Sequence, residues 1–322
     1  MRQVRLGQTD LQVSMIAFGT WAFGGDWGTA DLQDSRDTIH RALELGINFF
    51  DTAQGYGFGA AEQLLGDALR DRTSREEVII ATKGGLRPDG DRVARDASRR
   101  WLREGVESSL RSLGTDYIDL YQVHWPDLHT PPEETATALE ELVAEGKVRH
   151  VGVSNYDVDQ LQALRHFGRV ETLQPPYHLF RRDIESTILR YTSAHDLGVL
   201  VYGPLAHGLL SGRMNESTTF GADDWRSKSP DFTTDTFRWN LAVVERLKGL
   251  ARARDITLPQ LAVAWTLANP AVQATIVGAR RPAHLDETAA AADIKLSEAD
   301  LQDIDTILKD ALPVWGPHPD GM

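Results

Sequence analysis

The fold is decided by INFFDT at residues 47–52, a short apolar run that leads into a carboxylate. Two further apolar runs lead into ionisable residues, Val78–Thr82 just before Lys83 and Ile118–Val123 just before His124. Short, almost continuous apolar runs are typical of strands that are buried on both faces of a parallel sheet. We therefore expect three parallel strands, each with an ionisable residue at its carboxyl end.

Strand-like runs recur along the whole chain and alternate with amphipathic segments at intervals of roughly 30–40 residues, which is typical of βα units. The predicted strands are Met15–Phe18, Ile47–Asp51, Val78–Thr82, Ile118–Val123, Val148–Val153, Thr172–Pro175, Val199–Tyr202 and Thr275–Val277. The predicted helices between and after them are Asp34–Leu45, Ala61–Arg70, Ala97–Leu113, Glu133–Glu145, Val158–Phe167, Glu185–His195, Leu241–Arg254 and Pro282–Ala290.

Eight strands, each followed by a helix and joined by right-handed crossovers, close into a (β/α)8 TIM barrel of the α/β class. We expect residues 1–322 to form this barrel as a single domain. A doubly wound open sheet is the competing fold, but no GxGxxG motif follows the first strand and no switch point is evident.

Several segments fall outside the repeat. Arg2–Leu6 and Leu11–Val13 predict a hairpin that plugs the barrel floor. Ala206–Asn240 is too long for an ordinary connection and is expected to be a functional loop over the barrel mouth. Thr257–Leu267 and a segment from Ser297 to about Lys309 predict extra helices. The tail after Leu312 is rich in proline and glycine, and we expect it to be irregular and to cross the top of the barrel.

Composition limits the partners and the cellular setting. The formal net charge is −13, which argues against a nucleic-acid partner. The most basic stretch, Arg92–Arg103, is interpreted as the solvated opening of a helix capped by Asp96. No apolar stretch is long enough to span a membrane, and the first residues lack the apolar core of a secretory signal. The chain has no cysteine, and a cytoplasmic location is the simplest expectation.

An acid, a phenol, an amine and an imidazole are expected to meet at one edge of the barrel: Asp51, Tyr56 in the following loop, Lys83 and His124. Asp51 can pair with Lys83, and a charged Lys83 would lower the pKa of Tyr56 from its usual value of about 10. The phenol can then exchange a proton with a carbonyl oxygen that a neutral His124 orients. Singly, each residue could instead be structural, but four at matching strand ends favour a catalytic site.

The chain resembles the aldo-keto reductase family, in the branch of bacterial NADP-dependent oxidoreductases that is related to potassium-channel β-subunits. The motifs that carry this resemblance are Gly19–Trp21, Asn48–Ala53 with Tyr56-Gly57, Ala81–Lys83, Gln122–Trp125, Gly152–Asn155, Tyr202–Leu205 and Gly278–Arg280. They occur in family order and cover nearly the whole chain. The resemblance implies NADPH-dependent reduction of aldehydes or ketones, or the reverse oxidation of alcohols and polyols. It makes Tyr56 the general acid and completes a tetrad with Asp51, Lys83 and His124.

The resemblance also implies a cofactor site. Nicotinamide would rest on Tyr202, and the pyrophosphate would lie along Pro204–Gly212. Arg280 offers donors for a 2′-phosphate, which favours NADPH over NADH. His284 and Thr288 depart from the glutamine and asparagine that many relatives carry, so NAD stays an alternative. The expected cofactor residues are Gly19, Thr20, Trp21, Ser154, Asn155, Gln174, Tyr202, Pro204, Leu205, Gly208, Gly212, Arg213, Gly278, Arg280, His284, Glu287 and Thr288.

Aromatic residues in the loops near the tetrad are expected to wall a pocket for a small carbonyl or alcohol substrate. They are Trp21, Phe23, Trp27, Phe58 and Trp125. The alternative for about half of them is that they only cover the barrel rim. The physiological substrate and the direction of the reaction stay open, and the protein is expected to be a monomer or a homo-oligomer.

Two other classes of function were weighed. An aldo-keto reductase-like chain can serve as an accessory subunit that binds the cofactor, senses redox state and turns over slowly. A metal-assisted hydrolase on the same barrel is disfavoured, because no His, Asp and Glu cluster has ligand spacing. We therefore expect no metal, no nucleic acid and no membrane partner.

Overall fold

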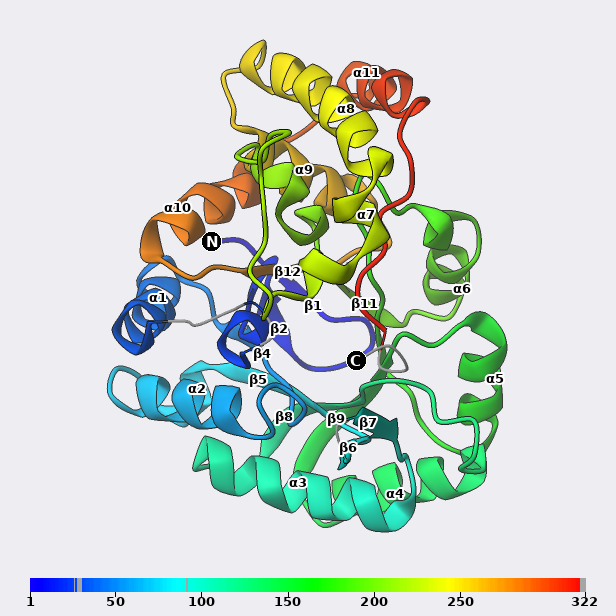
Figure 1. The fold of residues 1–322 in the computed structure, drawn as a ribbon. Helices are drawn as coiled ribbons and strands as arrows, with labels where there is room; N and C mark the ends of the chain where they lie inside the picture. The colour runs from blue at the N-terminus through cyan, green and yellow to red at the C-terminus, as the bar shows by residue number, and fades with distance from the viewer. Residues whose placement is uncertain (26, 28–30, 91, 319–322) are drawn as a thin grey trace.

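The computed structural model describes residues 1–25, 27, 31–90 and 92–318. Eight parallel strands close into a barrel, in the order β10-β11-β12-β3-β4-β5-β8-β9 (Figure 1). Their bounds are β3 (Ile16–Gly19), β4 (Phe49–Asp51), β5 (Ile79–Gly84), β8 (Ile118–Val123), β9 (Val148–Ser154), β10 (Thr172–Gln174), β11 (Gly198–Tyr202) and β12 (Ala274–Gly278). All eight predicted strands are present. The (β/α)8 prediction is confirmed, and the doubly wound sheet is excluded.

Helices surround the barrel on its outside (Figure 1). The helices in the connections between strands, and after the last strand, are α1 (Leu32–Glu44), α2 (Ala60–Arg70), α3 (Arg99–Leu113), α4 (Pro132–Ala144), α5 (Val158–Phe167), α6 (Ile188–Ala194), α9 (Leu258–Ala268) and α10 (Pro282–Ala289). Further helices are α7 (Pro230–Thr233), α8 (Asp235–Arg252) and α11 (Glu298–Leu308). Thr257 and Gln260 form a capping box at the start of α9, since each side chain bonds the other residue's backbone amide.

One assignment of helices was wrong. We predicted Leu241–Arg254 as the barrel helix and Thr257–Leu267 as the extra one. In the structure α9 packs against β12, whereas α8 packs against α7, α9 and α11. The composition of α9 explains its place, because eight of its eleven residues are buried and apolar or small, which suits a helix enclosed on most sides.

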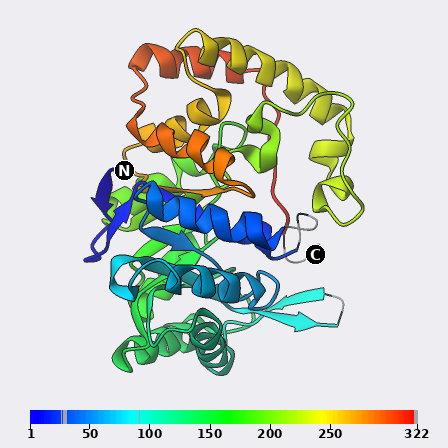
Figure 2. The ribbon, with the colours of Figure 1, turned by 90° about the vertical axis from the view of Figure 1, so that its left-hand side faces the viewer.

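The N-terminal hairpin closes one end of the barrel, as predicted. It consists of β1 (Gln3–Arg5) and β2 (Gln12–Ser14) and lies at the end of the barrel that is on the left in Figure 2. A buried cluster contains Leu6, Leu11 and Val13 from the hairpin segment. The same cluster contains residues that point into the barrel from alternate strand positions, namely Ala17, Phe49, Ala81, Leu120 and Leu200. The plug thus completes the interior core below the site.

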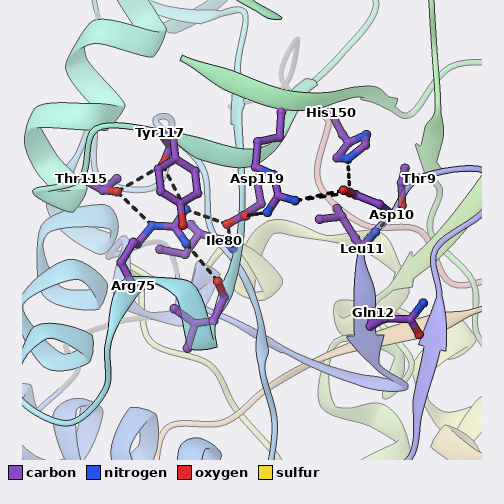
Figure 3. A network of polar contacts seen from close by, with 12 residues as sticks. Thr9, Asp10, Leu11, Gln12, Arg75, Ile80, Thr115, Tyr117, Asp119 and His150 are labelled. Atoms are coloured by element: carbon purple, nitrogen blue, oxygen red, sulfur yellow. Dashed lines mark hydrogen bonds and ion pairs between the residues drawn. The ribbon is translucent and has the colours of Figure 1, made fainter. Parts of the chain in front are cut away.

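A network of charged side chains joins the turn of this hairpin to the outer rim of the barrel floor (Figure 3). His150 bonds Asp10 through Nε2 at 2.7 Å and Glu171 through Nδ1 at 2.9 Å. Arg149 contacts both Asp10 and the buried Asp119, whose other oxygen accepts from Arg75 at 2.6 Å. Burial lowers the pKa of His150, but the bonds to Glu171 and Asp10 outweigh burial and raise that pKa above its usual value.

A second hairpin was missed. It is formed by β6 (Leu86–Asp89) and β7 (Arg92–Arg95), and it projects from the end of the barrel opposite the plug (Figure 2). The interpretation of Arg92–Arg103 as the opening of a helix is therefore wrong for its first half. The helix begins at Arg99 and Ser98 is its cap, while Asp96 accepts a bond from the Ser98 amide instead.

The segment Ala206–Asn240 is folded by its own aromatic side chains. Phe232 stands at the centre, with ring centroids 5.6 Å from Phe220, 5.8 Å from Trp225 and 6.0 Å from Phe237. Trp225 also packs edge-on against Trp27, which reaches it from the loop after β3. These contacts between rings pack the segment together. No helix in the described part of the chain is long and apolar enough to cross a membrane.

Candidate active site

Asp51, Lys83, His124 and Tyr56 come together at the carboxyl ends of β4, β5 and β8. Asp51 is the last residue of β4 and Lys83 the fifth of six residues in β5, so that both point into the barrel. Lys83 Nζ donates to Asp51 Oδ1 at 2.6 Å, to the Thr52 carbonyl at 2.9 Å and to the Tyr56 hydroxyl at 3.4 Å. The amine is therefore held by three oxygens, one of which is the phenol.

The pair of Lys83 and Asp51 is removed from water. Lys83 is 0% exposed and Asp51 2% exposed. Burial lowers the pKa of Lys83 and raises the pKa of Asp51, and the attraction between the two opposes both shifts. Gln174 donates to the second oxygen of Asp51 at 2.8 Å, which fixes the carboxylate against the lysine.

Tyr56 and His124 face each other above this pair. Their ring centroids are 5.6 Å apart and the rings are nearly perpendicular, at 81°. Burial lowers the pKa of His124 well below its usual value, and the positive Lys83 adds to this, so the imidazole is neutral. Because the ammonium donates to the phenol oxygen, the phenol hydrogen can be donated to a different acceptor. The arrangement can present a proton and a neutral imidazole to the same substrate atom.

Two cavities meet at Tyr56. The larger has a volume of about 350 Å³ and runs from Asp51 and Tyr56 to Arg280, His284 and Thr288. The smaller has a volume of about 80 Å³ and is lined by both Tyr56 and His124. Tyr56, Trp21, Gln174 and Tyr202 line both cavities. A group that reacts at the phenol would therefore lie where the two cavities join.

Most of the predicted cofactor residues line the larger cavity. These are Gly19, Trp21, Gln174, Tyr202, Pro204, Leu205, Gly208, Arg213, Gly278, Arg280, His284, Glu287 and Thr288. Ser154 and Asn155 line the smaller cavity, next to the shared Tyr202, whose hydroxyl donates to Asn155 at 2.8 Å. Thr20 and Gly212 line neither cavity. Thr20 is fully buried and bonds Thr52, and Gly212 lies between two lining residues, Ser211 and Arg213.

The backbone beside the larger cavity is unusual. Ala206 and His207 have positive φ angles of 47° and 56°, which side chains with a Cβ rarely adopt. Asn155, at the edge of the smaller cavity, has a φ of 64°. Such conformations cluster at ligand sites, where the surrounding structure imposes them. They support the assignment of this segment to ligand binding.

The far end of the larger cavity carries positive charge. Arg280 donates to the backbone carbonyl of Trp27, and burial lowers its pKa from the usual value. Arg213 contacts His284 at 2.6 Å and lies 3.9 Å from the carboxylate of Glu287. The guanidinium of Arg213 is 62% exposed, so it can still turn toward a ligand. Two arginines and one glutamate thus flank this end.

The predicted substrate aromatics divide into three groups. Trp21 lines both cavities and Trp125 lines the smaller one. Trp27 lines the larger cavity instead. Phe23 packs on Phe18 at 6.0 Å between ring centroids, Phe58 is 46% exposed, and neither lines either of these two cavities. The structure therefore places two of the five beside His124 and Tyr56.

Several lining residues were not anticipated. Leu86 and Val93 of the β6–β7 hairpin and Gly316 and Pro317 of the C-terminal tail line the smaller cavity. The predicted course of the tail across the top is thereby confirmed. Further lining residues of the larger cavity are Ala22, Gly203, His207, Ser211, Arg226, Pro259, Ile276, Val277 and Ala279. A turn signal at Pro88–Gly90 marked the hairpin in the sequence, but no signal marked which tail residues would meet the cavity.

Comparison with known proteins agrees with this geometry. The family model described as the aldo/keto reductase family matches residues 15–309. The aldo-keto reductase YhdN of Bacillus subtilis is 41% identical over 314 residues, which cover 97% of this chain and 95% of that protein. The NADH-specific methylglyoxal reductase of Escherichia coli is 35% identical over 316 residues, which cover 93% of this chain and 96% of that one.

A solved structure gives the same result in three dimensions. The glycerol dehydrogenase of Gluconobacter oxydans superposes with a TM-score of 0.88 at 39% identity, covering 98% of this chain and 97% of that one. Relatives named as enzymes favour an oxidoreductase over a redox-sensing accessory subunit. The chain belongs to the aldo/keto reductase family and is an oxidoreductase that acts on carbonyl or alcohol groups.

Proposed function

We propose that this protein reduces aldehydes or ketones with NADPH, or oxidises the corresponding alcohols, and that Tyr56 transfers the proton. The observation that carries the proposal is the position of Tyr56 at the junction of both cavities, with its hydroxyl 3.4 Å from the buried amine of Lys83. A phenol supported by an ammonium is a competent proton donor to a carbonyl oxygen.

The larger cavity suits a nicotinamide cofactor. Its volume of about 350 Å³ lies within the usual range for ligand sites, and it joins the tetrad to two arginines. Tyr202 and Gln174 would hold the nicotinamide end, the 203–208 backbone the pyrophosphate, and Arg280 with Arg213 the adenosine end. When bound there, the cofactor supplies or accepts the hydride.

The other groups act on the substrate carbonyl. Tyr56 holds the proton that passes to the carbonyl oxygen, and Lys83 stabilises the phenolate that is left. Asp51, fixed by Gln174, keeps the lysine in place. His124 is neutral and orients the carbonyl oxygen toward the phenol. Trp21 and Trp125 exclude water from the smaller cavity.

Replacing Tyr56 by phenylalanine tests proton transfer. Tyr56→Phe keeps the ring that contacts Trp21 and His124 but removes the hydroxyl. NADPH binding, followed by tryptophan fluorescence, should be retained, while kcat for reduction of an aldehyde should fall by about 10²–10⁴. A variant with more than a tenth of the parent kcat would show that another group supplies the proton.

The preference for NADPH rests on the arginines at the far end of the larger cavity, while Glu287 and a relative named NADH-specific argue against it. The dissociation constant for NADPH should be at least about tenfold lower than that for NADH in the parent protein, and Arg280→Ala should reduce this difference. Arg281→Ala is the matched control, because that neighbour pairs with Asp34 on the surface. Equal affinities for NADPH and NADH in the parent protein would refute the assignment of Arg280 to the 2′-phosphate.

A further inference from the structure

The smaller cavity is defined by an unusual absence of charge. Its lining contains four aromatic rings besides His124, namely Trp21, Tyr56, Trp125 and Tyr202, together with apolar Leu86, Val93 and Pro317. Its polar side chains, Ser154, Asn155, Gln174 and the Tyr56 and Tyr202 hydroxyls, are neutral. Among the residues that the structure describes, no lysine, arginine, aspartate or glutamate lines it.

We propose that this cavity selects uncharged carbonyl compounds and rejects anionic ones such as carboxylated or phosphorylated aldehydes. The inference rests on the proposed function, since it assumes that the reacting carbonyl lies between Tyr56 and His124.

The rejection of anions follows from the positions of the nearby cations. Lys83 is fully buried, and its three N–H donors go to Asp51, the Thr52 carbonyl and the Tyr56 hydroxyl. Arg95 lies against the ring of Trp125, with its guanidinium carbon 5.6 Å from the ring centre, and donates to the Pro126 carbonyl. Neither residue lines the cavity. The sequence positions outside the described ranges hold no lysine, arginine or histidine.

A carboxylate that entered this cavity would lose its water without gaining a positive partner. Such uncompensated desolvation of an ion is among the largest penalties in protein recognition. A neutral carbonyl compound of the same size pays no such penalty, and its apolar atoms pack on Trp21, Trp125 and Pro317. Discrimination therefore comes from the missing cation and not from a steric clash.

The test compares two dicarbonyl compounds of equal size with NADPH as cofactor. Methylglyoxal and glyoxylate are aldehydes with five non-hydrogen atoms each, but glyoxylate carries a carboxylate where methylglyoxal carries an acetyl group. With rates expressed per unhydrated aldehyde, kcat/KM for methylglyoxal should exceed that for glyoxylate by about 100-fold. A ratio below tenfold would overturn the inference.

A pair of variants tests whether the absence of a cation causes the discrimination between neutral and anionic aldehydes. Val93→Lys places an amine at the cavity wall from β7, and Val93→Met, with a similar length and no charge, is the matched control. The lysine variant should reduce the methylglyoxal-to-glyoxylate ratio at least tenfold relative to the methionine variant. Equal ratios in the two variants would overturn the electrostatic explanation.

Failure of this inference can be told from failure of the proposed function. If propanal, methylglyoxal and glyoxylate all leave NADPH unoxidised, and the three corresponding alcohols leave NADP⁺ unreduced, the proposed function fails and the inference with it. If neutral and anionic aldehydes are reduced equally well, the proposed function stands and the inference alone is refuted.

Discussion

Lys83→Met is the substitution that tests the electrostatic role of the tetrad most directly. Methionine roughly keeps the length of the side chain but removes the charge 3.4 Å from the Tyr56 hydroxyl. At an effective dielectric constant of about 20, that ammonium favours a phenolate by about 5 kcal/mol. In a transition state with the proton half transferred, about half of this stabilisation is present. Its loss in Lys83→Met would raise the barrier by about 2.5 kcal/mol and lower kcat roughly 70-fold.

The pH dependence distinguishes this role from a merely structural one. Without the positive charge, the phenol holds its proton more tightly, so the alkaline limb of the reduction profile should move to higher pH. Asp51→Asn leaves the ammonium with the Thr52 carbonyl and the phenol, so it should cost less turnover than Lys83→Met. His124 should add no titration near neutral pH, because burial holds its pKa well below the usual value.

Initial rates of NADPH oxidation between pH 6 and 10 would measure these effects, with urea unfolding as a check on the fold. Breaking a buried pair by removing one partner typically costs about 3–5 kcal/mol, so the assay must be run where each variant stays folded. If Asp51→Asn slowed turnover more than Lys83→Met, the carboxylate would have a chemical role that we have not assigned. An unshifted profile in Lys83→Met would refute the coupling to Tyr56.

Two further predictions concern the parts that surround the tetrad. If a bound cofactor orders Ala206–Asn240, trypsin cleavage between Arg213 and Arg238 should slow at least tenfold with saturating NADPH; equal rates would support the aromatic packing as sufficient. In the floor network, His150→Gln should cost about 1 kcal/mol of unfolding free energy near pH 6. The raised pKa of His150 means that this cost is full below about pH 6.5 and is lost as pH rises through the folded value. Denaturant midpoints from pH 5 to 9 would measure it, and a cost that is constant across that range would contradict the assignment.

The barrel could be predicted from the sequence because buried parallel strands appear in it as short, almost continuous apolar runs. β8 and α5 begin and end where the sequence pattern placed them, because β8 begins and ends with residues of the buried core and α5 begins at a capping box of Asp157 and Gln160. The convergence of Asp51, Lys83 and His124 followed from the same pattern, because parallel strands present their carboxyl ends at one edge. Strand ends are therefore the part of a site that a single sequence predicts well.

The β6–β7 hairpin was missed because its strands are half-exposed and rich in charge. Arg87, Pro88 and Asp89 interrupt any apolar alternation, and the arginines beyond the turn resemble a helix start. The turn signal Pro88-Asp89-Gly90 was present, and Gly90 has a φ of 63°, as such a turn requires. Local turn chemistry carried information here that hydrophobic periodicity did not.

Side chains on loops could not be sorted by sequence because tertiary packing decides where they point. Phe23 and Trp21 stand two residues apart in one short turn, yet Phe23 packs on the core and Trp21 lines both cavities. The residues of the tail that meet the smaller cavity depend on contacts made elsewhere, such as the bond from the Val314 amide to the Phe180 carbonyl. Such distant restraints leave no local pattern.

Residues that stabilise the fold gather at one end of the barrel, and the residues of the proposed reaction gather at the other. At the floor, His150 bonds both Asp10 and Glu171, Asp119 pairs with two arginines, and none of these residues lines either cavity. At the opposite end, the buried Lys83 and Asp51 tolerate desolvation, which a protein optimised only for stability would avoid. The floor network stabilises a barrel that carries this cost. Substitutions at the floor should therefore change the unfolding free energy without changing kcat, whereas Lys83→Met should change kcat more than its effect on stability explains.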